Sequence, residues 1–527
     1  MSETKEAAVA SATFQPPVDG TLHFAQRGGD IDNGTAAGDI SGFDAERMRA
    51  RTALTADEEK KLMRRVDRRI MILCSLIFLI KNLDANNLSN ARIMNKGTPH
   101  NIMKQLHLTS DEYSLLTVLY YIPYIVLEAP SNLLLKRVRP SVWQARIIIS
   151  WGVMLLCHIP VRNKGGIYAT RFLLGLFEAG MFPGVILQMT YWYRPDEMSI
   201  RLLYFYCLGN FSGVISGLLA YAFDTVSGHR GLSGWQWLFL TEGLLTLVVG
   251  VVVYFFLPDF PPTAKWLTDK EKAFIQARLP PNAPRADELN FNFREIVSAL
   301  KDTRLWLFTL IWALFTVGTN GVTFFQPTVI ANLGYTTIAQ AQLLNLPVSI
   351  LGIVVIAVSG YFADKSHFPR PVYPLMVYMV VLVCYGVLVA YPSDGGVYAA
   401  TLIGNAFVTA FYPLMWPWRV QTTAHATGSA FSIGFVNSYG QIGGAIGPQI
   451  FRAKYAPRYK ESFTAAMACV GAGLVVTLIT WWVTRHTERD TRRLKRARLD
   501  ASKKGMTVLE DVVDRDIAAK TRDDESA

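Results

Sequence analysis

Six ionisable residues stand inside long apolar stretches of this sequence, and Glu128 and Glu242 are the two that lie nearer to span ends. Lys81 and Asp84 follow the run IMILCSLIFLI, and Arg171 and Glu178 lie in the stretch RFLLGLFEAGMFPGV. A charged side chain at the centre of a membrane helix costs about 2.5–3.5 kcal/mol, so it faces protein or water and commonly marks the path of a solute or an ion. The sequence therefore predicts a polar site inside a membrane domain.

Lys81, Asp84 and Asn87 share one helix face. A helix that starts near Arg69 would carry Lys81 about 18 Å along its axis, past the middle of a hydrocarbon core about 30 Å thick. Asp84 and Asn87 follow at three-residue spacing on the same side. Lys81 and Asp84 could simply pair with each other and hold the helix in register. We favour a role for all three residues in a central, substrate-binding cavity, because apolar residues would serve stability alone.

Arg171 and Glu178 lie seven residues apart, two turns along one helix face. Gly175, Gly180 and Gly184 in the same stretch allow close packing of that face against a neighbouring helix. The two residues could belong to the polar site. Alternatively, Arg171 could have only a structural role and tie this span to a neighbour near the membrane surface.

The elements that hold these residues are membrane spans. The chain has 527 residues, of which 51% are hydrophobic and 18% are charged, against about 25% charged in an average soluble domain. The charges gather in residues 44–69, 258–304 and 485–527. Because the basic residues lie beside apolar runs, the net charge of +11 favours contact with anionic lipid head groups rather than with nucleic acid.

Twelve runs are long enough to cross a bilayer as helices, which takes about 20 residues each. They lie near residues 69–90, 113–135, 143–160, 166–191, 200–223, 236–257, 305–330, 340–362, 372–391, 395–416, 427–450 and 462–484. We therefore predict an all-α integral membrane protein with twelve transmembrane helices in two six-helix bundles. An even number puts both termini on one side, and the basic clusters at 60–69 and 485–496 predict that this side is the cytoplasm.

A charged, proline-punctuated linker separates the two bundles. In it, Thr268 and Glu271 have the spacing of a capping box, which predicts a short surface helix. The predicted organisation is a cytoplasmic tail, a first bundle, a cytoplasmic linker, a second bundle and a charged cytoplasmic tail, over residues 1–65, 66–258, 259–303, 304–485 and 486–527.

The two bundles carry similar features at equivalent positions, as expected of a duplicated fold. Span five contains GNFSGVISG and span eleven contains GQIGGAIGP, whose glycines lie on one helix face and allow close approach. The loops after spans two and eight, SNLLLKRVRPSVW and SGYFADKSHFPRP, are both short and basic and both contain a proline. Glu128 and Glu242 are acids near span ends, and Glu128 would lock the loop below span two. We predict gating or structural roles for these two acids and for residues of the segments above: Glu128, Lys136, Arg137, Gly213, Gly217, Glu242, Asp364, Lys365, Gly443 and Gly447.

The second bundle offers polar and aromatic partners for the cavity. Asn320 and Gln326 lie in TVGTNGVTFFQP of span seven, and Tyr412 and Trp416 belong to the region of span ten. Aromatic walls with a few polar groups suit a small, partly apolar ligand. We therefore add these four residues to the predicted substrate-binding set.

Taken together, five stretches resemble one transporter family: NLDANNLSNAR, EAPSNLLLKRVRPSVW, RFLLGLFEAGMFPG, GWQWLFLTEGLLT and LPDFPPTAKWLTDKEK. They are similar to the anion:cation symporter family of the major facilitator superfamily, with the closest similarity to the fungal allantoate and nicotinate permeases. The resemblance covers residues 60–490. It implies the major facilitator fold, a site between the two bundles near the midplane, and proton-driven uptake of small carboxylates.

In that family the end of the first span usually reads L-D-R-x-N, and its arginine is implicated in binding substrate anions. This sequence has Ala85 at the arginine position. We hypothesise that Lys81, one turn earlier on the same face, supplies the cation instead. The resemblance also ties Arg171 and Glu178 to proton coupling, and we predict that Asp84 takes part in it. No cofactor is expected besides the proton as coupling ion.

The sequence contains no GxxxxGK[ST], HExxH or GxSxG motif, so neither an ATP-driven pump nor a membrane enzyme is expected. Two other functions stay open: a proton-coupled exporter of a secondary metabolite, and a nutrient receptor that has the transporter fold but does not transport. The expected partners are a small-molecule substrate and the lipid bilayer, without nucleic acid or an obligate protein partner. The expected location is the plasma membrane.

Overall fold

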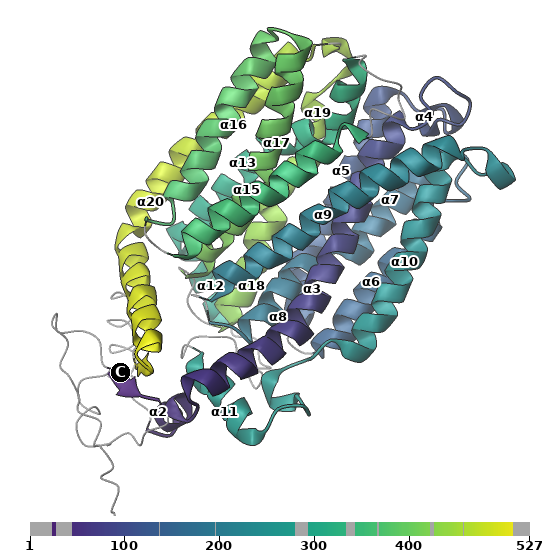
Figure 1. The fold of residues 1–527 in the computed structure, drawn as a ribbon. Coiled ribbons are helices and arrows are strands. Elements are labelled where there is room, and N and C mark those ends of the chain that lie inside the picture. The colour runs from purple at the N-terminus through teal and green to yellow at the C-terminus, as the bar shows by residue number, and fades with distance from the viewer. Residues whose placement is uncertain are drawn as a thin grey trace, which may run out of the picture.

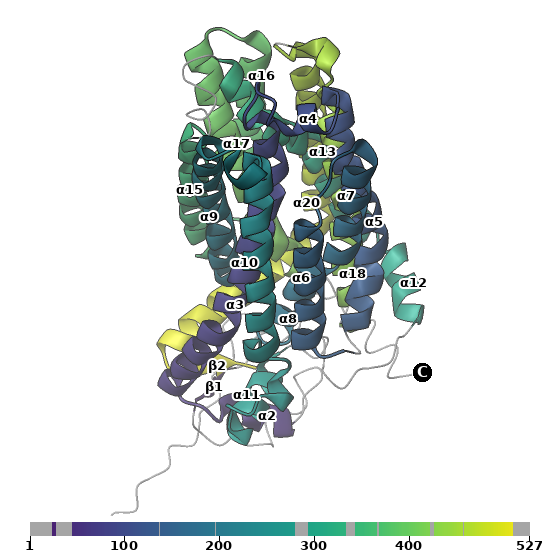
Figure 2. The same cartoon turned by 90° about the vertical axis from the view of Figure 1, so that its right-hand side faces the viewer.

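The chain forms a bundle of long helices with one small sheet at one end (Figure 1). The structure, a computed structural model, describes residues 24–27, 45–135, 138–194, 197–279, 293–333, 343–365, 368–421, 426–456 and 458–509. Figure 2 shows α2 (Ala45–Thr52), α11 (Asp269–Arg278) and the sheet together at one end of the bundle, which we call the linker end. The short helix α4 (Ile102–Gln105) lies at the opposite end, which we call the α4 end.

The first half of the bundle runs from α3 to α10. Ala179 and Gly180 alone separate α7 from α8, so these two helices together fill one predicted span. The helices of this half are α3 (Ala56–Ile93), α5 (Ser110–Leu135), α6 (Pro140–Leu156), α7 (Lys164–Glu178), α8 (Met181–Thr190), α9 (Met198–Thr225) and α10 (Gly234–Phe256).

The second half runs from α13 to α20, preceded by the short helix α12 (Phe293–Lys301). Gln441 alone separates α18 from α19. The helices of this half are α13 (Thr303–Asn332), α15 (Leu346–Asp364), α16 (Val372–Ala390), α17 (Asp394–Gln421), α18 (Ala426–Gly440), α19 (Ile442–Ile450) and α20 (Lys460–Lys503). Single 3₁₀ turns lie at His229–Gly231, Pro261–Thr263 and Ala453–Tyr455.

Nine helical segments among the described residues are long and apolar enough to cross a membrane, with α7 and α8 taken as one. Each of them overlaps a predicted span. The other three predicted spans coincide with α3, whose apolar run contains Lys81 and Asp84, with α6, which has only 17 residues, and with α18 and α19, which are broken at Gln441. A crossing by all twelve, with both termini in the cytoplasm, stays a prediction.

Large apolar side chains are exposed on the sides of the bundle. Phe255 is 71% exposed, and Trp482 and Val383 are each 66% exposed. Exposed apolar area on this scale is unusual for a soluble monomer, whereas the hydrocarbon of a bilayer would cover it at no cost.

Glycines on α9 bring three helices close together. Gly209 faces the ring of Phe78 on α3, and Gly213 faces Ser349 on α15 in the other half. A Cβ atom added at either glycine would collide with that neighbour. The first half therefore touches the second half through a glycine of its fifth predicted span.

Glycines on α19 make the equivalent contacts in the second half. Gly443 faces Thr316 on α13, and Gly444 faces the ring of Tyr121 on α5 in the first half. α19 belongs to the eleventh predicted span, α13 is the seventh and α5 is the second. In the first half, span five contacts span one of its own half and span eight of the other half. In the second half, span eleven contacts the equivalent spans, seven and two, as expected of a duplicated fold.

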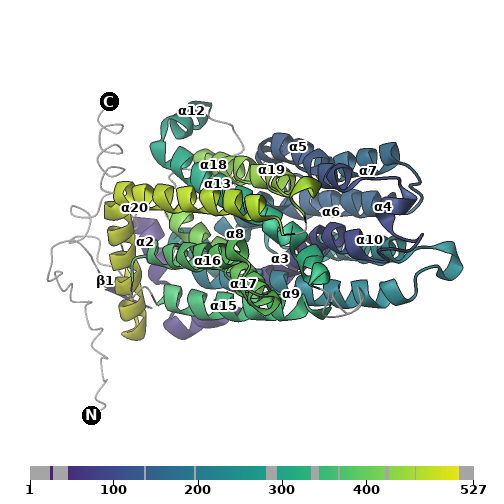
Figure 3. The same cartoon turned by 90° about the horizontal axis from the view of Figure 1, so that it is seen from above.

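At the linker end, helices extend beyond the predicted spans. α3 begins at Ala56 rather than near Arg69, because Thr55 and Glu58 form a capping box. The hydrogen bonds from Thr55 lower the pKa of the exposed Glu58 carboxyl. α20 continues past the predicted end at residue 484 to Lys503, and Figure 3 shows its last part turned away from the direction of the rest of the helix.

The sheet at the linker end joins the two ends of the described chain. β1 (Phe24–Gln26) pairs antiparallel with β2 (Met506–Val508). Next to β1, Arg27 donates from Nε to the carbonyl oxygen of Met506 at 3.2 Å and forms an ion pair with Glu59 of α3. The predicted linker helix is also present, since α11 begins at a capping box formed by Thr268 and Glu271.

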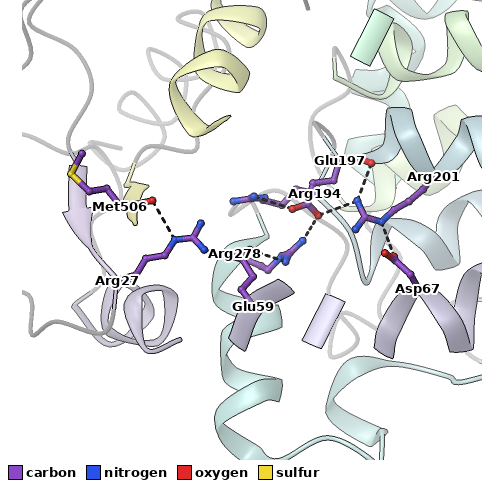
Figure 4. Close-up of polar contacts among 8 residues, drawn as sticks. All are labelled: Arg27, Glu59, Asp67, Arg194, Glu197, Arg201, Arg278 and Met506. Carbon is purple, nitrogen blue, oxygen red and sulfur yellow. Dashed lines mark hydrogen bonds and ion pairs between the residues drawn. The ribbon is translucent and has the colours of Figure 1, made fainter. Parts of the chain in front are cut away.

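Arg278 of α11 is the centre of an ion network that Figure 4 shows. Its side chain is 1% exposed, and it pairs with Glu59 at 3.3 Å and with Glu197, which lies just before α9. Burial lowers the pKa of Arg278, and the carboxylates of Glu197 and Glu59 act in the opposite direction. Arg201 of α9 extends the network to Asp67 of α3 at 3.0 Å. The linker helix is thereby bound to the starts of α3 and α9.

Candidate functional site

A cavity of about 310 Å³ lies between the two halves. It is bordered mainly by α3, α5 and α7 of the first half and by α13, α17 and α19 of the second. The structure brings seven of the predicted substrate and proton residues to its wall: Lys81, Asp84, Arg171, Glu178, Asn320, Tyr412 and Trp416.

Asp84, Arg171 and Glu178 form one buried group on this wall. They are 4%, 4% and 2% exposed, respectively. Trp151 of α6 donates from Nε1 to Oδ2 of Asp84 at 3.0 Å. Lys81 and Arg171 both lie within electrostatic range of the two carboxylates. The described residues show no ion pair between Lys81 and Asp84, so the alternative in which these two simply pair is not what the structure contains.

Arg171 is not the surface tie that the sequence left open. Its guanidinium carbon lies 5.2 Å from the centre of the Phe239 ring of α10, and its Nε and Nη2 atoms have no hydrogen-bond partner among the described residues. A buried guanidinium with unused donors beside a cavity is available to a ligand.

A break in the helix gives Glu178 its place. α7 ends at Glu178, and Gly180 takes a left-handed conformation with φ of 92° before α8 begins. A Cβ atom at Gly180 would also collide with Ser131 of α5. Only glycine adopts this backbone region without strain. The break leaves Glu178 at a helix end that faces the cavity, as in the discontinuous helices of other transporters.

Asn87 lies elsewhere than predicted. Its side chain is fully buried and donates from Nδ2 to Oε2 of Glu242 on α10. Neither residue borders the cavity. Asn87 therefore holds Glu242 inside the first half, and the substrate contact predicted for it has no support in this position.

A second cavity of about 230 Å³ adjoins the first. The predicted residue Gln326 borders this one and not the first, and Gly213 and Gly217 border it from α9. Tyr412 borders both cavities. Gly447, predicted as structural, packs against Gly321 of α13.

Aromatic side chains from both halves meet at the wall of the first cavity. Phe182 of α8 and Trp416 of α17 have ring centres 5.7 Å apart, and Tyr206 of α9 stacks on Tyr412 at 6.4 Å. Both pairs join the first half to the second. Tyr412 and Trp416 of α17 were predicted from the sequence, whereas their partners Phe182 and Tyr206 were not.

Glu128 makes a contact that the sequence did not indicate. It was expected to lock the loop below span two, but its Oε1 accepts a hydrogen bond from Nδ2 of Asn437 on α18 in the other half. Lys136 and Arg137 in that loop lie outside the described residues. Asp364 and Lys365 lie at the start of the equivalent loop, after span eight. Asp364 accepts a hydrogen bond of 2.6 Å from Nζ of Lys495 on α20, and the ammonium of Lys365 lies 4.3 Å from the centre of the Tyr361 ring.

Arg92 lies on α3 beyond the residues that border the cavities, toward the α4 end, and its contact with the second half was also missed. It is 4% exposed, and its guanidinium carbon lies 4.2 Å from the centre of the Phe325 ring on α13. Its Nη2 donates to Oγ of Ser110 at 2.5 Å. The sequence signal was an arginine at the end of the same motif that holds Lys81 and Asp84. Contacts between the halves therefore extend beyond the cavities toward the α4 end.

The described residues contain no group of three or more His, Cys, Asp and Glu side chains that could hold a metal ion. The chemistry of the site rests on ammonium, guanidinium, carboxylate and carboxamide groups.

Residues 93–448 match the family model described as Major Facilitator Superfamily. The chain belongs to the Major Facilitator Superfamily. It is therefore a multi-pass membrane transporter rather than an enzyme, as the sequence predicted.

This superfamily transporter has fungal relatives along most of its length. It is 29% identical to MFS transporter prlL of a fungal species (strain NRRL 50135), over 88% of this chain and 94% of the relative. It is 28% identical to MFS-type transporter cnsO of Penicillium expansum, over 82% and 85%. It is 29% identical to Major facilitator-type transporter hxnP of Emericella nidulans, over 82% and 88%.

Solved structures of superfamily members share its fold. The human organic anion transporter MFSD10 aligns with a TM-score of 0.56 at 11% identity, over 79% of this chain and 99% of that one. The E. coli fucose:proton symporter FucP aligns with a TM-score of 0.56 at 11% identity, over 77% and 97%. At this identity the likeness concerns the fold alone.

Proposed function

We propose that this transporter takes up a small organic anion together with protons, and that it belongs to the anion:cation symporter family that its motifs resemble. The observation that carries the proposal is the group of Lys81, Asp84, Arg171 and Glu178 on the wall of one cavity between the halves. Contacts between the halves include Glu128 with Asn437 and, nearer the α4 end, Arg92 with Phe325. The cavity would open to the two sides of the membrane in turn as such contacts break and form.

Lys81 would bind the anion. Ala85, at the position where the resembling family has arginine, also borders the cavity, one helical turn from Lys81. The cavity thus keeps a cation although the arginine is absent. An ammonium attracts a carboxylate as a point charge without the two-pronged geometry of arginine, so this transporter would tolerate more variation in the shape of the acid.

Asp84 and Glu178 would carry the proton. Both carboxylates are buried beside Arg171, and Oδ1 of Asp84 has no hydrogen-bond partner among the described residues. Burial penalises the charged form of a carboxyl group, while a nearby cation favours it. A substrate anion that approaches Lys81 and Arg171 would weaken their hold on these carboxylates and so couple its own binding to protonation.

The test is uptake in a yeast that lacks its own permeases. Labelled carboxylates, ureides and vitamins are supplied at acidic and at neutral external pH, with and without a protonophore, and surface expression is checked on the same cells. Uptake that rises in acid and disappears with the protonophore supports proton-coupled import and the expected plasma-membrane location. If the protein is at the surface and no acid enters, the proposal is wrong, and efflux from loaded cells then tests the exporter function.

A further inference from the structure

The second cavity has a different chemistry from the first. None of the described residues that border it is Lys, Arg, His, Asp or Glu. Its wall instead carries carboxamides from both halves. Asn82, Asn86, Asn90 and Asn210 come from α3 and α9, and Gln326, Asn345 and Asn405 come from the second half.

Hydrogen bonds within the wall hold these amides in place. Nε2 of Gln326 donates to Oδ1 of Asn345 at 3.0 Å, and Oγ1 of Thr323 donates to Oδ1 of Asn405 at 3.1 Å. Asn405 is 3% exposed, and its Nδ2 has no hydrogen-bond partner among the described residues. A buried amide nitrogen is costly without an acceptor, so Asn405 presents an unused donor at this cavity.

The two cavities share part of their wall. Asn82, Asn86 and Tyr412 border both of them. The charged residues that border the first cavity, Lys81, Asp84, Arg171 and Glu178, all come from α3 and α7. A molecule that occupies both cavities would therefore meet charges at one end and neutral amides at the other.

We propose that the second cavity is a subsite for an uncharged carboxamide group of the substrate. A carboxamide offers both donors and acceptors, which matches a wall of side-chain amides and hydroxyls. A charged group would be buried there without a counter-ion, and an apolar group would leave the wall amides unpaired. The transported molecule would thus be an acid that carries an amide at its other end, an inference that rests on the proposed function for its acidic end.

Competition for uptake tests this subsite. The labelled acid is the best substrate found in the uptake panel. Its competitors are glutaramate and the analogue in which an isopropyl group replaces the terminal carboxamide at equal size. A site built to hydrogen-bond a ligand strongly rejects the analogue that lacks the bonding group. We expect glutaramate to compete at least about tenfold better than the isopropyl analogue, and equal competition overturns the inference.

Substitutions in the second cavity test whether the preference for glutaramate arises there. Asn405→Leu should reduce the tenfold difference to near equality, while Val348→Ala, which alters an apolar residue of the same cavity, should preserve it. Thr323→Val, which removes the hydroxyl that holds Asn405, provides a second variant if Asn405→Leu does not reach the membrane. A preference that survives both Asn405→Leu and Thr323→Val overturns the assignment to this cavity.

A neutral probe separates this inference from the proposed function. If no acid is transported, purified protein is heated with and without millimolar glutaramide, a diamide without charge. A rise in melting temperature that Asn405→Leu abolishes supports the amide subsite even though anion transport has failed. An unchanged melting temperature of the unsubstituted protein would mean that only water occupies this cavity.

Discussion

Asn437 of α18 donates a hydrogen bond to Glu128 of α5 across the boundary between the two halves of the transporter. The two residues are 1% and 0% exposed, and the second carboxylate oxygen of Glu128 has no hydrogen-bond partner among the described residues. Removal of one partner of a fully buried hydrogen bond leaves the other polar group unsatisfied, which is costly. The bond therefore joins the first half to the second inside the bundle.

Removal of this bond is expected to destabilise the folded transporter. Asn437→Ala and Glu128→Ala should each lower the free energy of unfolding by about 1–3 kcal/mol, and the double variant should lose less than the sum. Thermal unfolding in detergent measures all three. Tyr439→Phe, on the exposed side of α18, is the control and should stay within about 0.5 kcal/mol. Strictly additive losses would show that the two residues do not interact.

Lys81 is expected to determine affinity for the substrate anion. Lys81→Ala should raise the apparent KM for uptake at least tenfold, since a hydrogen bond to a charged group contributes about 1.5–3 kcal/mol. Lys81→Arg keeps a cation in the cavity and should recover part of the affinity. Lys61→Ala, an exposed lysine of the same helix, is the matched control. An unchanged KM for Lys81→Ala would remove Lys81 from the site.

Glu178 is expected to couple transport to protons. Glu178→Gln keeps the shape of the side chain but cannot release a proton, so uptake by this variant should no longer rise in acid. Exchange of labelled for unlabelled substrate should continue, because exchange needs no net proton movement. Glu112→Gln is the control, since Glu112 pairs with Lys164 at 2.7 Å near the start of α5 and outside the cavity. Retained pH dependence in Glu178→Gln would assign coupling to another group.

Hydropathy predicted most of the long helices, and charged residues within apolar spans predicted the charged wall of the cavity. Nine predicted spans coincide with long apolar helices, and Lys81, Asp84, Arg171 and Glu178 meet at one cavity. The reason is physical: a charge in an apolar span must turn toward protein or water, so its presence alone indicates the interior. Helix periodicity then shows which other residues of the same helix share its inward face.

Periodicity does not identify the neighbour that a face meets. Asn437 and Glu128 are 309 positions apart, and Trp151 reaches Asp84 from α6, for which no site residue was predicted. Asn87 was misplaced for this reason, since it shares the general direction of Asp84 but bonds to Glu242 on α10. The sequence also gave no way to distinguish a glycine that packs, such as Gly175, from one that breaks a helix.

Gly180 is that helix-breaking glycine, and its replacement is expected to disrupt the site. In Gly180→Ala a side chain must adopt φ of 92° and also displace Ser131, and the backbone strain alone costs about 1–2 kcal/mol. Uptake should fall with stability because Glu178 lies two residues away. Gly471→Ala on α20, where a Cβ meets nothing within 4 Å, should be neutral or slightly stabilising. Equal melting temperatures for the two variants would contradict the strained turn.

Arg278 and Arg65 permit a comparison between a buried and an exposed ion pair of the same linker helix. Arg278 is 1% exposed and holds Glu59 and Glu197, whereas Arg65 is 49% exposed and pairs with Glu271. Arg278→Ala removes the buried cation that joins Glu59 to Glu197, so it should lower the free energy of unfolding by about 2 kcal/mol. Arg27 still pairs with Glu59 and Arg194 with Glu197 in this variant. Arg65→Ala should cost less than about 1 kcal/mol, since water and salt screen an exposed pair.

Salt gives a second readout of the same comparison. The small loss in Arg65→Ala should vanish as ionic strength rises, while the loss in Arg278→Ala should persist, because counter-ions reach a buried pair poorly. Thermal unfolding of both variants across a salt series measures this difference. If both losses were small and equally sensitive to salt, the network would be a surface feature, and the linker helix would be held to α3 and α9 by its apolar face alone.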